Sequence, residues 1–262
     1  MKFCRFVPLD SAVAKPPVSV YGVLEGDLVR EISSAPWSSW SQGSRTWPVA
    51  GVRLLAPVEP SKIVCVGRNY AAHAAEFGNE VPKEPLIFLK PPSAIIAAGE
   101  PIVLTPQSQR VEHEAELALI VGRRCSQLKD SEDALSYLLG YCCLNDVTAR
   151  DLQKSDVQFT RAKGFDTFCP VGPHIETQLD PSDLLVEARV NGVLRQSGRT
   201  SLMVYPPAFL VRWISRVMTL LPGDVIATGT PAGVGPLVAG DIVEVSVQGV
   251  GVLRNPVQAP HT

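Results

Sequence analysis

The segment from Val111 to Gly122, VEHEAELALIVG, constrains the fold of this chain more than any other stretch. In a β-strand alternate side chains share a face, so Glu114 and Glu116 are expected to point the same way, beside Ala118 and Ile120. The opposite face would carry the apolar side chains of Ala115, Leu117, Leu119 and Val121. Both faces are mostly apolar, which is typical of a strand that is covered on both sides.

Two carboxylates on such a strand need a compensating charge. Burying a charged group is costly unless it is paired or coordinates a metal. No Lys or Arg lies between Glu112 and Gly122 to act as a local partner. A hard divalent cation such as Mg2+ prefers oxygen ligands and would resolve the conflict. The segment therefore indicates a metal site at Glu114 and Glu116.

Chain length and charge limit the classes of protein that need to be considered. With 262 residues the chain is long enough for a sizeable core without disulfides, as one large domain or one domain with a small appendage. Its 24 basic and 26 acidic side chains leave a net charge of -2, which provides no electrostatic reason to expect nucleic acid or an anionic membrane as partner. No apolar run approaches the roughly 20 residues that span a bilayer, and the N-terminal sequence MKFCRFVPLD lacks the apolar core of a signal peptide.

The six cysteines occur without a C-x-x-C motif, and several lie in apolar runs such as KIVCVG and LLGYCCLND. We interpret them as reduced packing residues, and we expect a cytoplasmic protein.

The N-terminal part is predicted to be a small β-rich domain. Residues 18–32 read as two strands around the turn Glu25-Gly26-Asp27. The Trp- and Ser-rich segment 35–51 has little periodicity, and we predict an irregular connection there. Two prolines near residues 57–60 suggest a boundary between domain 1–57 and domain 58–262, and we expect the chemistry in the second.

A short alanine-rich helix is predicted over residues 70–77, after an apolar strand at 62–67. Asn69 is expected to cap this helix, and Gly78 follows it. A helix of two turns is marginal by itself in water, so the segment could order on ligand binding, as a lid would.

His73 and Glu76 stand three residues apart and would face each other on this helix. A carboxylate beside an imidazole fixes its tautomer and raises its basicity, as a general base requires. The alternative is an ordinary solvated polar pair.

Two further charged residues follow predicted elements. An apolar run ends at Asn145-Asp146, where Asp146 could join Glu114 and Glu116 as a third ligand or cap a helix that starts near Val147. Lys163 is either a surface charge or a cation that neutralises an acidic substrate or an oxyanion.

Three other elements are predicted from local pattern. A helix capped by Ser131 is expected over 131–139, and a hairpin over 186–196 around Asn191-Gly192. A longer helix follows Pro206 and Pro207. Its predicted core stripe, opposite Arg212, Ser215 and Arg216, consists of Phe209, Leu210, Trp213, Ile214, Val217 and Met218.

Five separated motifs occur in the order GRNYAAHAAEFGNEVPKEPLIFLKPPSA, HEAELALIVG, LNDVTARDLQ, TRAKGFDTFCPVGP and PGDVIATGTPAGVGP. Together they resemble the fumarylacetoacetate hydrolase superfamily, and most closely its bacterial members and the acylpyruvate hydrolase/oxaloacetate decarboxylase branch. Each motif alone is a weak signal, but five in this order are specific. The resemblance covers about residues 60 to 257, and the N-terminal part resembles a small domain often found ahead of it in bacterial members.

The resemblance implies an α+β, mainly β fold, a mixed-sheet roll or sandwich with few helices, and a homodimer. It implies Mg2+ or Mn2+ held by Glu114, Glu116 and Asp146. By alternation Glu112 shares the face of the glutamates, and only the family motif leaves it out. His73 and Glu76 match a water-activating dyad on a mobile lid. The positions that contact or surround the substrate are Lys163, Arg68, Lys90, Arg150, Gln153 and Thr230.

The implied activity is metal-dependent cleavage of a C–C bond in an acylpyruvate-type 2-oxo acid. His73, oriented by Glu76, would deprotonate the attacking water, the metal would stabilise the enolate, and Lys163 would offset its charge. Oxaloacetate decarboxylation and isomerisation of a 2-hydroxyhepta-2,4-diene-1,7-dioate type substrate share that enolate. The dyad favours hydrolysis. A protein that binds 2-oxo acids without turnover is the alternative from another class.

Overall fold

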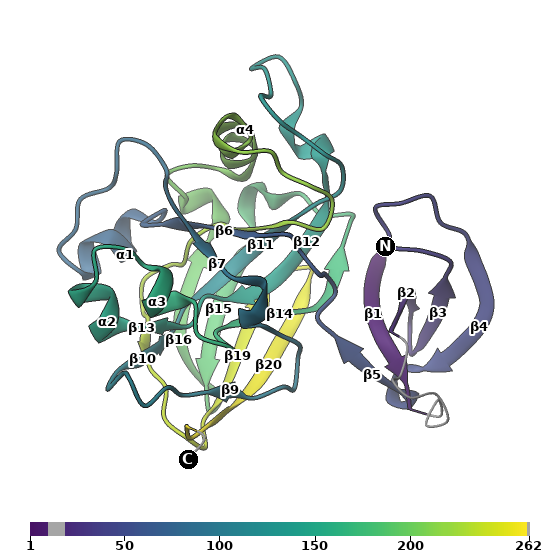
Figure 1. The fold of residues 1–262 in the computed structure, drawn as a ribbon, viewed down its shortest axis with the longest axis horizontal. Helices are drawn as coiled ribbons and strands as arrows, with labels where there is room; N and C mark the ends of the chain where they lie inside the picture. The colour runs from purple at the N-terminus through teal and green to yellow at the C-terminus, as the bar shows by residue number, and fades with distance from the viewer. Residues whose placement is uncertain (10–18, 261–262) are drawn as a thin grey trace.

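The computed structural model, described here for residues 1–9 and 19–260, consists mainly of β-strands with few helices (Figure 1). The four α-helices in this part of the chain are α1 (Ala71–Glu76), α2 (Arg150–Ser155), α3 (Thr160–Lys163) and α4 (Pro207–Val217). Short 3-10 turns lie at Val49–Gly51, Pro92–Ala94, Ala134–Tyr137, Pro181–Asp183 and Thr200–Leu202. The predicted α+β, mainly β class is confirmed.

The largest sheet joins the N-terminal strands to those of the main body. Its strands, in spatial order, are β4 (Gln42–Pro48), β3 (Leu28–Ile32), β2 (Val20–Glu25), β1 (Lys2–Pro8), β14 (Cys169–Glu176), β12 (Leu138–Asn145), β11 (Ala115–Val121), β17 (Val225–Ala227), β6 (Ile63–Gly67) and β7 (Leu86–Lys90). Off this path, β5 (Val52–Leu55) pairs with β1, and β8 (Ile95–Ile96) pairs with β14. Most pairs are antiparallel, whereas β17–β6 and β14–β8 are parallel, so the sheet is mixed.

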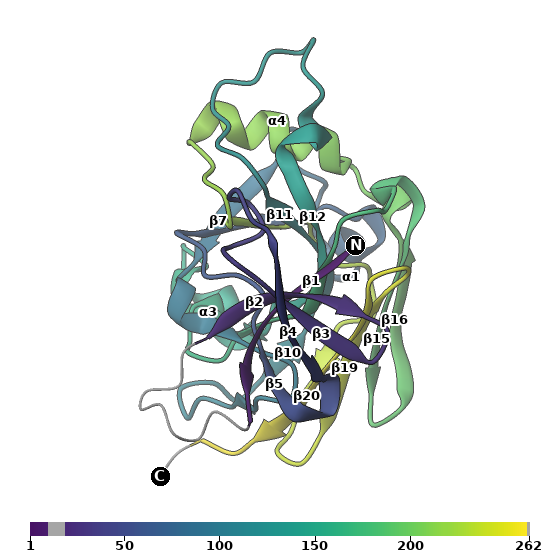
Figure 2. The ribbon, with the colours of Figure 1, turned by 90° about the vertical axis from the view of Figure 1, so that its right-hand side faces the viewer.

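Two smaller sheets complete the fold. One has the order β13 (Thr148–Ala149), β10 (Val111–His113), β18 (Gly235–Pro236). The other has the order β16 (Val193–Arg199), β15 (Leu185–Val190), β19 (Ile242–Val247), β20 (Gly251–Gln258), β9 (Ile102–Val103). Viewed at right angles to Figure 1, α4 lies beyond one end of β11 and β12 (Figure 2).

The N-terminal strands β1–β5 form a lobe beside the main body (Figure 1), but they are not separate from its sheet. Strand β1 pairs with β14, with Lys2 opposite Glu176 and Phe3 opposite Ile175. The predicted division of the chain near residues 57–60 stays a prediction, because one sheet crosses from the lobe into the body.

Strand β11 separates two parts of the core, as its alternation predicts. Leu117 and Leu119 belong to one hydrophobic cluster, and Ala118 and Ile120 belong to another on the opposite face. All four side chains are fully buried. The predicted single strand, however, is interrupted at Glu114, because β10 pairs in the three-stranded sheet and β11 in the large one.

Both predicted hairpins form. Gly26 has φ 63°, and Asn191 and Gly192 have φ 52° and 78°, values that turn sequences of this type favour. Strands β2–β3 and β15–β16 follow from these turns. Of the first predicted hairpin segment, Val18 lies outside the described residues.

Three local predictions are wrong because tertiary contacts override local signals. The predicted helix 131–139 is a 3-10 turn capped by Asp133, and β12 already begins at Leu138. The predicted irregular segment 35–51 contains β4, which pairs with β3. Asn69 does not cap α1; its amide donates to the carbonyls of Tyr205 and Thr228 instead.

The predicted buried face of α4 is rotated. Leu210 and Ile214 are buried as expected, but Phe209 and Val217 are 39% and 52% exposed. Val211 and Ser215 are buried in their place. Ser215 tolerates burial because its hydroxyl donates to the Arg212 carbonyl and accepts from the Leu128 amide.

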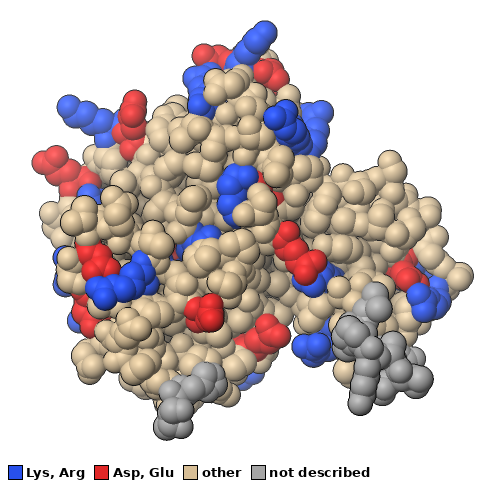
Figure 3. Space-filling model, viewed as in Figure 1, with Lys and Arg blue, Asp and Glu red and all other residues tan. Residues whose placement is uncertain are grey.

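The described part of the chain has mixed surface charge, reduced cysteines and short helices. On the face shown in Figure 3, acidic and basic side chains are interspersed. All six cysteines are buried and unpaired, as predicted for packing residues. No helix within residues 1–9 and 19–260 is long and apolar enough to cross a membrane.

We predict that Gly140→Ala destabilises the fold, because β12 approaches β14 too closely for a side chain at this position. A Cβ at Gly140 would lie 2.3 Å from the carbonyl oxygen of Glu176. Overpacking of this kind costs about 1–3 kcal/mol in the free energy of unfolding, measurable by urea denaturation. Gly51→Ala is the control, since its nearest neighbour would be at 3.6 Å. Equal stability of the two variants would contradict the close approach.

Candidate active site

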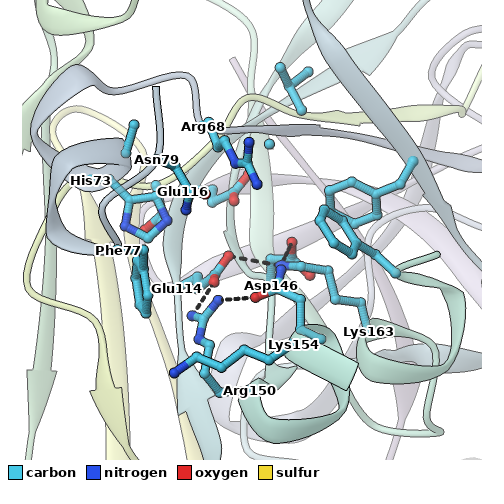
Figure 4. Close-up of a pocket in the computed structure, with 17 residues that line it drawn as sticks. Arg68, His73, Phe77, Asn79, Glu114, Glu116, Asp146, Arg150, Lys154 and Lys163 are labelled. Atoms are coloured by element: carbon cyan, nitrogen blue, oxygen red, sulfur yellow. Dashed lines mark hydrogen bonds and ion pairs between the residues drawn. The ribbon is translucent and has the colours of Figure 1, made fainter. Parts of the chain in front are cut away.

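A cavity of about 310 Å3 is lined in part by residues of helices α1, α2 and α3. Its lining combines three carboxylates, four cationic side chains, an imidazole and several apolar groups (Figure 4). The polar lining residues are Arg68, His73, Asn79, Glu114, Glu116, Asp146, Arg150, Gln153, Lys154, Lys163 and Thr230. The volume suits a small molecule.

Glu114, Glu116 and Asp146 converge in this cavity. Each offers a ligand atom, and these atoms lie within 4.8 Å of one another. Glu114 sits at the break between β10 and β11, Glu116 lies on β11, and Asp146 follows the end of β12. Two hydrogen bonds join the segments: the Asp146 amide donates to the Glu114 carbonyl, and the Glu114 amide donates to the Asn145 side chain, each at 2.9 Å. Pairing of β11 with β12 therefore brings the third carboxylate to the first two.

The charge on Glu114 and Asp146 is compensated by cations from distant segments, which sequence proximity could not reveal. Lys163 Nζ donates to Glu114 Oε2 at 2.9 Å, to Asp146 Oδ2 at 2.6 Å and to Thr148 Oγ1 at 2.8 Å. Arg150 donates to Glu114 Oε1 at 2.5 Å. Burial acts to raise the pKa of Glu114, but the charges of Lys163 and Arg150 hold it below its usual value.

Lys90 binds the carboxylate cluster through Asp146 from outside the cavity lining. It is 1% exposed, and its ammonium donates to Asp146 Oδ1 at 2.6 Å and to the Val147 carbonyl at 3.2 Å. It is not among the residues that line the cavity. The structure therefore places Lys90 behind a carboxylate of the cluster, and its predicted place among the residues that contact or surround the substrate stays a prediction.

Glu116 differs from the other two carboxylates. It is 2% exposed and, within the described residues, makes no ion pair. Its carboxylate accepts a hydrogen bond from the Gly229 amide at 2.8 Å. Burial, together with the charges of Asp146 and Glu114, raises the pKa of Glu116 well above its usual value. A divalent cation would supply the missing charge, so this oxygen donor set fits Mg2+ or Mn2+.

Glu112 is kept apart from the cluster by the break at Glu114. Its carboxylate pairs with Arg150 at 2.7 Å and with Arg110 at 2.5 Å. Arg150 thus connects Glu112 with Glu114, and its guanidinium also donates to Gln153. Alternation along one uninterrupted strand cannot show this separation.

His73 and Glu76 form the predicted contact on α1. His73 Nδ1 lies 3.2 Å from Glu76 Oε2, and His73 is only 8% exposed, so the solvated-pair alternative does not describe the histidine. Glu76 is held in turn by the Gly233 amide at 3.2 Å and does not itself line the cavity. An ionised carboxylate can only accept, so Nδ1 carries the proton and Nε2 remains as a base.

Three other predicted residues, Arg68, Gln153 and Thr230, line the cavity and differ in their bonding partners. Arg68 has φ 57°, an uncommon backbone state for a residue with a side chain, and makes no ion pair among the described residues. Gln153 accepts from Arg150, and the Thr230 hydroxyl donates to the Ala115 carbonyl at 2.8 Å. Arg68 is thus the predicted residue whose charge is available to a ligand.

Sequence reasoning missed part of the lining. Phe77 and Asn79 lie within the first family motif, but no spacing or charge pattern marked them. Phe88, Lys154 and Phe159 come from three separate elements or loops. The guanidinium of Arg150 lies over the Phe77 ring at 4.7 Å, and the Lys163 ammonium lies over Phe88 at 5.0 Å. These aromatic contacts follow from tertiary packing alone.

The mixed β fold thus carries a buried cluster of three carboxylates that could hold a divalent cation, with a His–Glu pair beside it. Residues 62–258 match the family described as "Fumarylacetoacetate (FAA) hydrolase C-terminal", and residues 1–57 match "Rv2993c-like, N-terminal". The chain belongs to the fumarylacetoacetate hydrolase family, which confirms the resemblance. Its neighbours include isomerases, a tautomerase and a hydrolase.

Among the relatives, one matches the chain almost over its full length and another over about four fifths of it. Protein Rv2993c of Mycobacterium tuberculosis is 49% identical over 94% of this chain and 96% of its own length. The mitochondrial oxaloacetate tautomerase fahd2 of Xenopus laevis is 43% identical over 79% of this chain and 69% of its own.

Solved structures that share the fold include an isomerase and a hydrolase. The 5-carboxymethyl-2-hydroxymuconate delta-isomerase of Mycobacterium smegmatis has a TM-score of 0.90 at 47% identity, covering 99% of this chain and 100% of that one. The maleylpyruvate hydrolase of Sphingobium sp. SYK-6, in complex with manganese(II) and pyruvate, has a TM-score of 0.79 at 32% identity, covering 100% of both chains.

We predict that Lys163→Met destabilises the protein in the absence of divalent cation. Removing Lys163 leaves Arg150 as the remaining cation at Glu114 and Lys90 as the remaining cation at Asp146, so the buried carboxylates are under-compensated. We expect a loss of up to about 3–5 kcal/mol in the free energy of unfolding, the cost of breaking a buried ion pair. Urea denaturation in EDTA measures the loss. Lys154→Met, at an exposed cavity residue, is the control and should leave stability nearly unchanged. Similar behaviour of both variants would show that Lys163 does not stabilise the cluster.

Proposed function

We propose that this protein is a divalent-metal-dependent enzyme that moves a proton to and from the carbon next to the keto group of a small 2-oxo dicarboxylate. The observation that carries the proposal is the placement of His73, oriented by Glu76, in the same cavity as the acidic triad. Glu114, Glu116 and Asp146 would hold Mg2+ or Mn2+. The chemistry that such a cation supplies is Lewis-acid stabilisation of negative charge on substrate oxygens.

The cavity's charge supports a dianionic substrate. Four cationic side chains and three carboxylates line it, and a bound dication would leave three positive charges in excess. Arg68 and Lys154 are not committed to ion pairs with the triad, whereas Arg150 and Lys163 are. Arg68 is suited to bind a carboxylate because a guanidinium presents several donors in one plane.

His73 supplies the proton-transfer group. Glu76 accepts from Nδ1, so Nε2 is the atom that would take and return the substrate proton. Lys163 is fully engaged with Glu114, Asp146 and Thr148, and its role is to keep those carboxylates charged and in place. The isomerase and tautomerase names of relatives at 43–47% identity support this reaction type.

Hydrolysis of the C–C bond of an acylpyruvate is the second candidate. It is favoured by the same dyad, because His73 Nε2 could deprotonate a water that attacks the distal carbonyl. The maleylpyruvate hydrolase relative supports it at lower identity. Decarboxylation of oxaloacetate needs no attacking water and no base. Binding without turnover would leave the oriented imidazole without a purpose.

Three accompanying proposals concern the oligomeric state of the protein, its location and its binding partner. We propose that it is a homodimer, which light scattering would test. The buried, unpaired cysteines support a reducing cytoplasmic location. The partner is a small 2-oxo acid, and nothing in the charge balance of -2 favours nucleic acid.

We predict that Mn2+ raises the thermal midpoint of the wild type and that Glu116→Gln abolishes this shift. A ligand that binds the folded state at a hundred times its dissociation constant stabilises it by about 2.7 kcal/mol. Gln cannot supply the charged oxygen that Glu116 offers. Glu76→Gln, which changes a carboxylate outside the triad, should keep the shift. A full shift in Glu116→Gln would remove Glu116 from the ligand set.

We predict that, with Mg2+ or Mn2+, the enzyme tautomerises or isomerises unsaturated 2-oxo dicarboxylates, and that His73→Ala lowers kcat by about 100-fold or more, as loss of a general base does. A panel of oxaloacetate, 2-hydroxyhepta-2,4-diene-1,7-dioate and acylpyruvates, followed by ultraviolet absorbance and product analysis, measures it. Cleaved products from acylpyruvates alone would favour the hydrolase instead. Turnover that survives His73→Ala would remove His73 from the reaction, and no turnover of any member would leave only the binding protein.

A further inference from the structure

We propose that Gln196, on β16 and outside the cavity lining, is the positioning residue that sets the geometry of the candidate cation ligands and of the loop that contacts the His73–Glu76 pair. This inference rests on the proposed function. Gln196 is fully buried, and its side-chain amide makes four hydrogen bonds, so all of its main donor and acceptor positions are used.

The first contact is to the backbone between the two glutamates. Ala115, which separates Glu114 from Glu116, donates its amide to Gln196 Oε1 at 2.9 Å. The Ala115 carbonyl accepts from the Thr230 hydroxyl at 2.8 Å. Strand β17 pairs with β11 only from Ala118 to Ile120, so the amide and the carbonyl of Ala115 are bound by side chains instead. These two contacts, together with the hydrogen bonds that join Glu114 to Asn145 and Asp146, hold the backbone from which both glutamates project.

The second contact is to the loop that follows β17. Gln196 Nε2 donates to Thr230 Oγ1 and to the Pro231 carbonyl, each at 2.7 Å. A peptide carbonyl can only accept and a peptide amide can only donate, so Pro231 and Ala115 fix which end of the Gln196 side chain is oxygen. His113 Nδ1 lies 2.9 Å from the same oxygen and completes its coordination.

The loop after β17 also contacts one candidate cation ligand and one member of the His73–Glu76 pair. The Gly229 amide donates to Glu116 Oε2 at 2.8 Å, and the Gly233 amide donates to Glu76 Oε1 at 3.2 Å. Thr230, between them, lines the cavity. One buried amide thus connects the glutamate backbone, a cavity hydroxyl and the support of the dyad.

Strand β16 is shaped to bring Gln196 to this position. Ala188 pairs with Gln196 and Arg189 with Leu194, so Arg195 is an extra residue in a β-bulge. Bulges redirect side chains and are frequent beside active sites. The loop packs directly on the strand, since a Cβ at Gly198 would lie 2.5 Å from Pro231 and one at Gly233 would lie 2.2 Å from the Arg195 carbonyl.

The test is the affinity for Mn2+, measured by isothermal titration calorimetry on the full chain without substrate. Gln196→Met keeps the size of the side chain and removes all four hydrogen bonds, and we expect the Kd for Mn2+ to rise 10- to 100-fold, as for other residues that orient metal ligands. Asn255→Leu is the matched control. Asn255 is a buried amide with two carbonyl partners, Ala97 and Glu100, away from the cavity, and its loss should lower the thermal midpoint while leaving Kd within twofold.

A second variant, Gln196→Glu, tests the same contacts in case Gln196→Met does not fold. Gln196→Glu keeps an acceptor for Ala115 but, when ionised, cannot donate to Thr230 or Pro231, and we expect weaker Mn2+ binding despite the added negative charge. Unchanged or tighter binding in the folded variant, or an equal loss in Asn255→Leu, would overturn the role of Gln196. Absence of Mn2+ binding by the wild type would instead overturn the proposed function. Wild-type binding without turnover of 2-oxo acids would overturn the activity alone.

Discussion

The burial of three carboxylates in one small space is the constraint on which the rest of this structure depends. Carboxylates removed from water must be neutralised, and the fold does this unevenly. Glu114 and Asp146 have cations from α2, α3 and β7, whereas Glu116 has only a backbone amide. This asymmetry leaves one carboxylate of the cluster without a cationic partner, and a divalent cation would supply the positive charge that is missing there.

The strand break at Glu114 separates Glu112 from the carboxylate cluster. A continuous strand would direct Glu112, Glu114 and Glu116 to one face, and a single cluster of three glutamates would form. The change of sheet between β10 and β11 sends Glu112 to Arg150 and Arg110 instead. Just past the break, where β17 does not reach β11, the amide and carbonyl of Ala115 bind Gln196 and Thr230. The break in the strand therefore helps to set which carboxylates face the cavity.

The same loop that supports Glu116 also supports Glu76, so the candidate cation site and the candidate base are built on common backbone. Gly229 and Gly233 supply these two amides from positions four residues apart. A single loop conformation thus determines the distance between the two functions.

The sequence by itself determined the family, the mainly β class, both hairpins and the alternation of β11, because turn residues, period-2 apolar patterning and ordered motifs are local properties of the chain. It also indicated Glu114, Glu116 and the His73–Glu76 contact, since each pair is close in sequence. Only the tertiary structure decided that Lys90 lies behind Asp146, that Asn69 binds distant carbonyls and that α4 buries Ser215. It alone revealed Gln196, because the partners of a buried amide come from sheets and loops that are remote along the chain.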